Sequence, residues 1–300
     1  MKQFTIVGLG EVLWDVFPTH KQLGGAPTNF AYISRVLGDN GVVASRTGAD
    51  GLGMEVKERV RALGLNDTFI QVDPQHATGT VRVEVKDGQP RFEILEPVAW
   101  DFLEWTPQWE ELARNADAVC FGSLAQRGPV SRATIRSFVG SVKPGAVRVF
   151  DINLRQSYFS PQVLKASAAN ADILKLNHEE VATACKMLGA PSFEKLGFAD
   201  WLCREYSLKL VCITCGAAGS VLVCGEEQHR HPGYPVQVVD TVGAGDAFTA
   251  ALVHHYMRGS SLAVMNDAAN RMGSLVASKA GATPEFTAEE VEAVRICSPA

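Results

Sequence analysis

Residues 240–248 read Asp-Thr-Val-Gly-Ala-Gly-Asp-Ala-Phe, and this stretch decides how the rest of the chain is interpreted. A β-like run at 235–239 precedes it, and apolar residues follow at the spacing of a helix. Gly243 and Gly245 allow a tight turn and a close approach of the backbone to a ligand. The amides of residues 243–245 would then lie at a helix N-terminus, where unpaired N–H groups and the helix dipole favour an anion.

Asp246 stands among these predicted donors. A carboxylate beside a bound phosphate suggests phosphoryl transfer, with the carboxylate as the base for an attacking hydroxyl. The plainer alternative is a turn whose aspartate only caps the helix. The stretch closely resembles the C-terminal signature of the ribokinase/PfkB family of carbohydrate kinases. That resemblance implies that Asp246 is the catalytic base and that Gly243, Ala244 and Gly245 form the anion hole.

Length and charge restrict the class of protein. A chain of 300 residues suits one large α/β domain or two small ones. A net charge of −5 gives no general attraction to nucleic acid or anionic membranes, and no apolar run approaches the roughly 20 residues of a membrane span. The first eight residues read as a strand rather than a signal peptide. We therefore expect a cytoplasmic enzyme that binds neither nucleic acid nor membrane.

Strand-like runs alternate with helical patterns along most of the chain. The predicted strands are 4–9, 42–46, 118–121, 147–152, 173–176 and 208–214. The predicted helices are 27–37, 52–63, 130–141, 161–169, 178–188, 193–206, 245–258 and 261–280. This alternation implies an α/β fold with a mainly parallel central sheet and helices on both faces.

One segment interrupts the alternation of strands and helices. Residues 80–86 and 91–95 read as two strands joined by a turn at Asp87-Gly88, which is a hairpin inserted into the α/β pattern. On pattern alone the hairpin is equally well a decoration. The family resemblance implies a single ribokinase-like domain over 1–300, with a small β lid over the sugar formed from about 11–26 and 79–96. It also implies a homodimer formed through that lid.

Two N-terminal strings add candidate substrate-binding residues. They are Gly-Glu-Val-Leu-Trp-Asp-Val-Phe-Pro at 10–18 and Leu-Gly-Gly-Ala-Pro-Thr-Asn-Phe-Ala at 23–31. Asp15 and Asn29 offer hydrogen-bonding groups suited to a polyol, although alone they could be a turn carboxylate and a residue of a first helical turn. The strings resemble the sugar-binding elements of fructokinases. By that resemblance Asp15 and Asn29 hold sugar hydroxyls, and Gly24 and Gly25 close over the sugar.

Polar groups also end two predicted strands in the middle of the chain, where ligands of doubly wound sheets collect. They are Ser123, in Phe-Gly-Ser-Leu-Ala at 121–125, and Asn153 and Arg155, in Asp-Ile-Asn-Leu-Arg at 151–155. Arg155 alone is more simply explained as half of a surface ion pair. The second string resembles one found in fructokinases and in 2-keto-3-deoxygluconate kinases. An acidic substrate would need basic partners, for which Arg82 and Arg155 are the candidates.

The nucleotide site is predicted mainly from the resemblance. Asn177-His178-Glu179-Glu180 matches the family's N-x-x-E, although the spacing alone fits a helix capping box. Thr-Cys-Gly-Ala-Ala-Gly at 214–219 resembles the family's nucleotide loop, and the sequence has no Walker A string. The resemblance implies ATP and Mg²⁺ as cofactors, with Mg²⁺ held through water by Glu180. The implied ATP contacts are Asn177, Thr214, Gly216, Gly219 and Asn270.

A monovalent cation, K⁺, is a further expectation from the family. Asp240 and Val242 are its candidate ligands, but the family often has Thr where this chain has Val242, which weakens the expectation. A backbone carbonyl could serve in place of the missing hydroxyl.

Together these patterns favour an ATP-dependent sugar kinase that converts fructose to fructose 6-phosphate. The alternatives are a 2-keto-3-deoxygluconate kinase, a nucleoside kinase, and a sugar-binding regulator that has lost catalysis. A Rossmann dehydrogenase is disfavoured, because Gly8-Leu9-Gly10 is followed by Leu13 where the dinucleotide fingerprint requires Gly.

Overall fold

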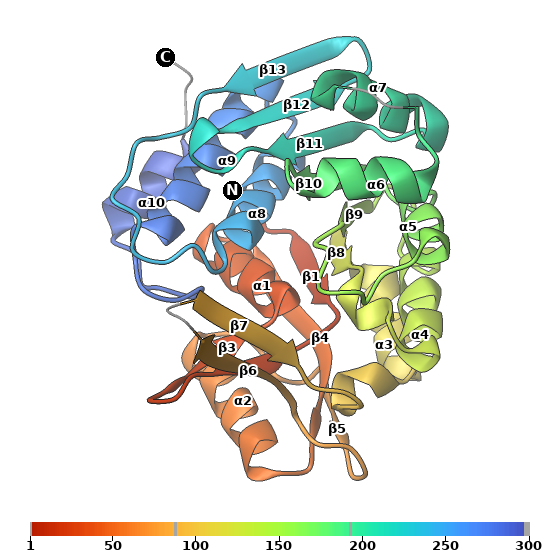
Figure 1. The fold of residues 1–300 in the computed structure, drawn as a ribbon, viewed down its shortest axis with the longest axis vertical. Coiled ribbons are helices and arrows are strands. Elements are labelled where there is room, and N and C mark those ends of the chain that lie inside the picture. Colours follow the sequence, from red (N-terminus) through yellow and green to blue (C-terminus); the bar gives the residue numbers. More distant parts are fainter. Residues whose placement is uncertain (1, 87–88, 192–193, 297–300) are drawn as a thin grey trace.

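A nine-stranded sheet forms the centre of the molecule within residues 2–86, 89–191 and 194–296, which the computed structural model describes (Figure 1). Its strands, in spatial order, are β13 (Glu227–His231), β12 (Ser220–Cys224), β11 (Leu210–Thr214), β10 (Ile173–Asn177), β9 (Val147–Asp151), β8 (Ala118–Gly122), β1 (Thr5–Leu9), β4 (Asn40–Gly48) and β5 (Ile70–Asp73). All neighbouring pairs are parallel except β11–β12 and β12–β13.

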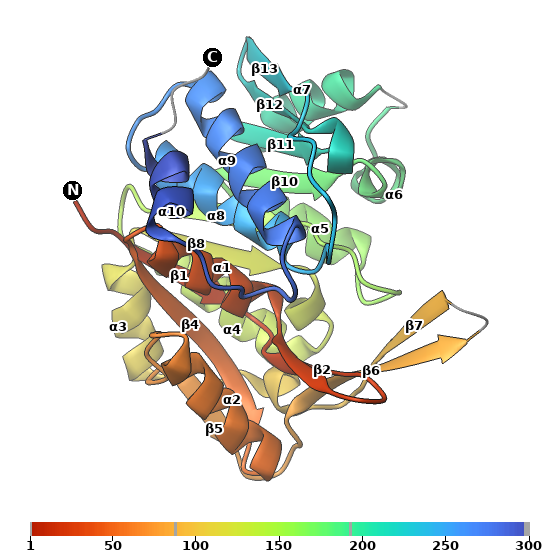
Figure 2. The ribbon, with the colours of Figure 1, turned by 90° about the vertical axis from the view of Figure 1, so that its left-hand side faces the viewer.

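Helices cover both faces of this sheet, as Figures 1 and 2 show. One layer comprises α1 (Ala26–Val36), α2 (Gly51–Ala62), α8 (Ala244–Tyr256) and α9 (Leu262–Ala277), with α10 (Ala288–Arg295) packed on α9. The other comprises α3 (Pro107–Asn115), α4 (Pro129–Gly140), α5 (Pro161–Ala168), α6 (Glu180–Leu188) and α7 (Lys195–Tyr206). Short 3₁₀ turns lie at Ala99–Phe102, Leu124–Gln126 and Gly216–Ala218.

Two apolar cores result, one on each face of the sheet. In β1, Ile6 packs into the core under α1 and α8, whereas Val7 and Leu9 pack into the core under α3 to α7. Because the central strands are buried on both faces, their sequences are apolar throughout rather than alternating.

The order of the strands reverses between β1 and β8, in the middle of the sheet. From β1 the chain proceeds outward to β4 and β5, and it then returns to β8 and proceeds the other way through β9, β10 and β11. The connections leaving β1 and β8 therefore diverge, and such a switch point is where open α/β sheets bind ligands.

A second, four-stranded sheet projects from the body of the molecule (Figure 2). It consists of β3 (Lys21–Gly24), β2 (Leu13–Val16), β6 (Gly79–Lys86) and β7 (Gln89–Ile94) in that order. These are the segments from which a lid was expected, although the Asp87-Gly88 turn lies outside the described residues. Its closure over a sugar and its role in dimerisation remain predictions.

The α/β class and the parallel sheet are confirmed, but one predicted strand is wrong. Residues 235–239 are irregular, and the preceding strand ends at His231. Pro232 and Pro235 cannot donate to a strand ladder, and Val238 and Val239 are exposed. The elements β5, β12, β13, α3 and α10 were not predicted. Among the described residues, no helix is both long and apolar enough to cross a membrane.

Candidate active site

A small cavity of about 20 Å³ opens at the switch point between β1 and β8. It brings together segments from both ends and the middle of the chain, because its lining includes Glu11, Phe121, Asp151, Asn153, Asp246 and Thr249. The predicted base therefore lies where the strand order alone would place a ligand.

Asp246 lies in the first turn of α8 and is held by Asn29 of α1. The Asn29 Nδ2 donates to Asp246 Oδ2 at 2.8 Å. Removal from water raises the pKa of Asp246 to about 6, although the hydrogen bond from Asn29 opposes this shift. The Oδ1 of Asn29 is buried without a hydrogen-bond partner among the described residues, so it can accept from a substrate hydroxyl.

The glycines before Asp246 have different roles. Gly243 begins α8 with φ = 77°, and a Cβ there would lie 2.6 Å from the Cβ of Ala282. Gly245 does not have a positive φ, so Gly243 is the residue of this pair whose backbone conformation requires glycine. The amide of Ala244 donates to Thr241 O at 3.3 Å, which makes it less available to a ligand than the sequence suggested. Other amides of the first turn have no intrahelical acceptor, as at any helix N-terminus.

The glycine pair before α1 makes room for two acidic residues. Gly25 precedes α1 with φ = 105°, and a Cβ there would lie 2.5 Å from the carbonyl oxygen of Glu11. A Cβ on Gly24 would lie 2.5 Å from Asp15 Oδ2. Burial raises the pKa of Asp15 to about 6, while the charge of Arg155 acts in the opposite direction. Asp15 is thus a half-buried carboxyl group on β2, and the absence of a side chain on Gly24 leaves room for it.

Glu11 is a site residue that the sequence analysis did not single out. Glu11 lies two residues after the end of β1. It lines the cavity, and its side chain is only 4% exposed. Burial raises its pKa to about 7, and the nearby charge of Asp246 raises it further against the opposing backbone hydrogen bond. Its position just beyond the carboxyl end of the first parallel strand, where such sheets bind ligands, could have identified it from the sequence.

The residues that follow β8 and β9 differ in their availability to a substrate. Ser123 Oγ donates to Ile152 O at 2.7 Å, so this hydroxyl supports the loop after β9. Asn153, with φ = 41°, lines the cavity. Arg155 is exposed and donates to Leu154 O, and among the described residues it forms no ion pair, so the surface ion-pair interpretation is wrong.

Arg82 does not belong to the predicted substrate site. The register of the small sheet places it beside Val16 and Glu93, whereas Asp15 lies beside Val81. Successive residues of a strand point to opposite faces, so Arg82 lies on the face away from Asp15. Its guanidinium is paired with Glu93 at 3.1 Å.

The predicted nucleotide residues Thr214, Gly216 and Gly219 lie in the loop after β11, and Thr214 is in register with Asn177 at the end of β10. Asn177 Oδ1 accepts from the amide of Glu180, and Glu180 Oε2 accepts from the amide of Asn177. These are the reciprocal bonds of a capping box.

The remaining predicted cofactor ligands are already engaged within the protein. Asn270 is buried and donates to Ser220 Oγ at 2.7 Å and to Asn266, so its surroundings do not support a contact with ATP. Asp240 accepts from the amides of Val242 and Gly281. The described residues contain no group of three or more His, Cys, Asp or Glu side chains that could hold a metal ion.

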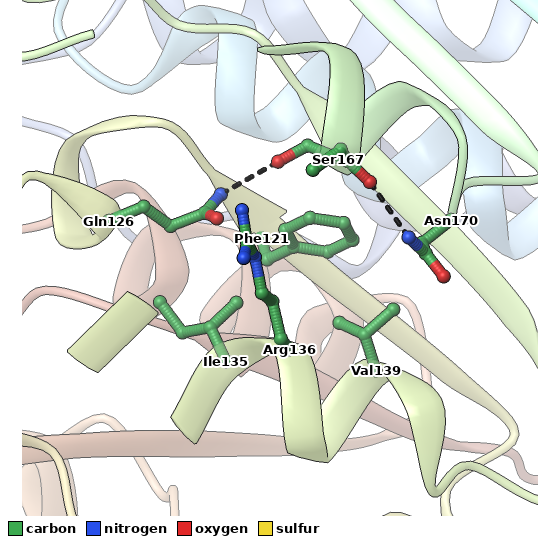
Figure 3. Close-up of a pocket in the computed structure, with 8 residues that line it drawn as sticks. Phe121, Gln126, Ile135, Arg136, Val139, Ser167 and Asn170 are labelled. Atoms are coloured by element: carbon green, nitrogen blue, oxygen red, sulfur yellow. Dashed lines mark hydrogen bonds between the residues drawn. The ribbon is translucent and has the colours of Figure 1, made fainter. Parts of the chain in front are cut away.

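A larger cavity, of about 210 Å³, lies between α4 and α5 on the other side of Phe121 (Figure 3). Gln126 donates to Ser167 Oγ across it, and Arg136 extends into it. Its lining includes no Asp, Glu or His, so it offers no base for phosphoryl transfer.

Comparison with known proteins agrees with this geometry. The model of the pfkB family carbohydrate kinases matches residues 5–288. The chain belongs to this family. It is a carbohydrate kinase with a ribokinase-like fold.

Named relatives within the family differ in their acceptors. The chain is 29% identical to the uncharacterized sugar kinase PH1459 of Pyrococcus horikoshii, over 92% of this chain and 91% of that protein. The crystal structure of PH1459 in complex with ATP matches with a TM-score of 0.79 at 26% identity, covering 97% and 99% of the two chains. A fructokinase of Escherichia coli is 29% identical over 82% of both chains. An ATP-dependent 6-phosphofructokinase of Thermoanaerobacterium thermosaccharolyticum is 27% identical over 87% and 84%.

Glu11 should make stability depend on pH in a specific direction. Its pKa of about 7 in the folded protein exceeds the ordinary value of 4.5, so the folded state holds a proton that the unfolded state has lost. Stability should therefore fall as pH rises between these values, by up to about 3 kcal/mol from this group. Urea unfolding of Glu11→Gln at pH 5 and pH 8 should show a smaller fall than the wild type.

The matched control is Glu58→Gln, which changes an exposed glutamate on α2 and should retain the wild-type pH dependence. An unchanged pH dependence in Glu11→Gln would show that Glu11 ionises at its ordinary pKa.

Proposed function

We propose that this kinase transfers the γ-phosphate of ATP to the primary hydroxyl of a ketohexose, with fructose to fructose 6-phosphate as its reaction. The observation that carries the proposal is the Asp246 carboxylate, held by Asn29 at the N-terminus of α8 and facing the cavity. A base beside helix-terminal donors suits the attack of a hydroxyl on a phosphoryl group. The ATP complex of PH1459 and the E. coli fructokinase support the choice of substrates.

The residues divide the reaction between them. Asp246 accepts the proton of the hydroxyl as its oxygen attacks, while amides of the first turn of α8 donate to the phosphoryl oxygens. The Oδ1 of Asn29 and the carboxylate of Asp15 accept from other sugar hydroxyls, which fixes the orientation of the sugar. Bound ATP supplies the phosphoryl group, and Mg²⁺ bound with it offsets part of the charge.

The nucleotide and the two cations would be held by different parts of the chain. The loop at 214–219 lies beside Asn177, so both can contact one nucleotide. Glu180 is buried, and its two carboxylate oxygens accept from the amides of Leu154 and Asn177. It would therefore hold Mg²⁺ only through water, as an ion that retains several of its waters allows. The K⁺ site at Asp240 and Val242 remains a proposal that depends on backbone carbonyls, since the Asp240 oxygens already accept from two amides.

The charge of the cavity favours a neutral sugar. Glu11, Asp15 and Asp246 are three acidic groups at the site, and Arg155 is the exposed cation whose charge acts on all of them. A carboxylate or phosphate on the sugar would meet like charge, whereas a neutral polyol can donate to these oxygens. The second candidate is a sugar acid such as 2-keto-3-deoxygluconate, and the unpaired Arg155 is the observation that favours it.

Asp246→Asn should fold and bind ATP but lose most turnover, because a positioned base contributes about 10²–10⁴-fold. Steady-state kinetics with fructose, together with calorimetric titration of ATP, checks both parts. Turnover close to that of the wild type would remove Asp246 from the role of base.

Asn29→Leu should move the acid limb of the kcat/KM profile to higher pH. Turnover needs the ionised base, so activity falls as pH drops through the pKa of Asp246, about 6 in the intact site. Loss of the donated hydrogen bond should raise that pKa by about one unit. A profile from pH 5 to 9 that keeps its acid limb unchanged would contradict the assigned base.

The wild type should prefer fructose to 2-keto-3-deoxygluconate and to fructose 6-phosphate by about tenfold or more in kcat/KM, equivalent to ~1.4 kcal/mol. Asp15→Asn preserves size while removing charge, so it should reduce fructose activity and narrow the preference over the acidic sugars. A coupled ADP-release assay across the three sugars provides the measurement. A tenfold preference for either acidic sugar would reject fructose as the substrate.

A further inference from the structure

A buried lysine lies directly behind the first turn of α8. Lys175 is the central residue of the apolar strand β10 and is only 6% exposed. Its Nζ lies 3.0 and 3.2 Å from the two carboxylate oxygens of Asp151, at the end of β9. A Cβ built on Gly245 would lie 3.2 Å from the same Nζ. The ammonium group is therefore packed against the backbone that precedes Asp246.

Asp151 connects this lysine to α8 by a second route. Thr249 Oγ1 donates to Gly245 O at 2.9 Å and lies 3.3 Å from Asp151 Oδ2. Asp151 and Thr249 also line the cavity beside Asp246. A buried ion pair costs so much desolvation that apolar residues would join two strands at least as well. The position of this pair at the cavity therefore calls for a role beyond strand packing.

We propose that Lys175 is a positioning residue for phosphoryl transfer. Its ammonium group supports the first turn of α8 from behind and offsets the negative charge at Asp246 and at the transferred phosphate. The inference rests on the proposed function, in which Asp246 is the base. The residue is not a catalytic residue, because its side chain does not line the cavity and meets the turn only at Gly245.

The surrounding charges are consistent with this role. The acidic groups that act on this region come from several elements: Glu11 after β1, Asp151 on β9, Glu180 on α6 and Asp246 on α8. The cations that act on Asp246 are the buried Lys175 and the exposed Arg155.

The buried lysine keeps its own charge at neutral pH. Burial alone would lower the pKa of Lys175, but the charges of Asp151, Glu180 and Asp246 raise it above its ordinary value. Its charge in turn lowers the pKa of Asp246. The lysine is therefore a fixed positive charge buried between Asp151 and the first turn of α8.

A double-mutant cycle tests the proposal with Lys175→Met, Asp151→Asn and their combination. In Lys175→Met, kcat for fructose should fall about tenfold or more with little change in the KM for fructose, because the lysine acts on the charge that develops in transfer. The acid limb of the kcat/KM profile of this variant should move to higher pH. Without the lysine, the negative charge of Asp151 raises the pKa of Asp246. In the double variant the acid limb should return towards wild type while kcat remains low.

The double variant also protects the test against misfolding, because it buries no unpaired charge. The matched control is Asp39→Asn/Arg258→Met, which removes a buried ion pair at the opposite end of α8. It should lower the Tm but leave kcat within about twofold. A folded double variant with wild-type kcat would overturn the proposal, as would an equal loss of kcat in the control.

The result also separates this inference from the proposed function. If Asp246→Asn loses turnover while the folded Lys175 variants keep it, only the role of Lys175 is wrong. If Asp246→Asn retains turnover, the base assignment fails whatever the Lys175 variants do.

Discussion

One hydrogen bond, from Asn29 Nδ2 to Asp246 Oδ2, joins residues 217 positions apart and links the first turns of α1 and α8. Both helices begin at a glycine with positive φ, Gly25 and Gly243. The positive ends of two helix dipoles therefore lie at one cavity, which residues of the first turns of α1 and α8 line. That convergence attracts anions, and it explains why carboxyl groups and a phosphoryl group can share the same small space.

The acidic groups of this cavity are not equivalent. Burial raises the pKa of Asp246 to about 6 and that of Glu11 to about 7, and each charge disfavours the other. At neutral pH Asp246 is then mostly ionised, while Glu11 holds its proton for part of the time. Both groups line the cavity, so the site offers an acceptor and, for part of the time, a donor. The hydrogen bond from Asn29 and the charges of Lys175 and Arg155 all lower the pKa of Asp246 against the effect of burial.

The sequence predicts residues of this site only where a short local pattern has a direct physical reason. A glycine turn before a helix predicts an anion site, and Asp246 within it predicts a base. The side of a sheet to which a strand residue points was harder to predict, because it depends on how the strand pairs with its neighbours. Arg82 was misplaced for this reason, since only its pairing with Val16 and Glu93 shows which side it occupies. Lys175 was overlooked although a lysine within an apolar strand requires a buried partner.

In the proposed function, the residue that selects the sugar and the residue that acts as the base lie on different parts of the fold. Asp15 belongs to a four-residue strand of the projecting sheet, whereas Asn29 and Asp246 belong to helices packed against the main sheet (Figure 2). A change in the projecting sheet can alter the contacts to the sugar without moving the base, because the Asn29–Asp246 bond does not pass through it. Relatives named as kinases of fructose and of 6-phosphofructose accordingly align with this chain along most of its length. In the proposed function, therefore, the choice of acceptor can depend on the projecting sheet, while the chemistry depends on the helix ends at the cavity.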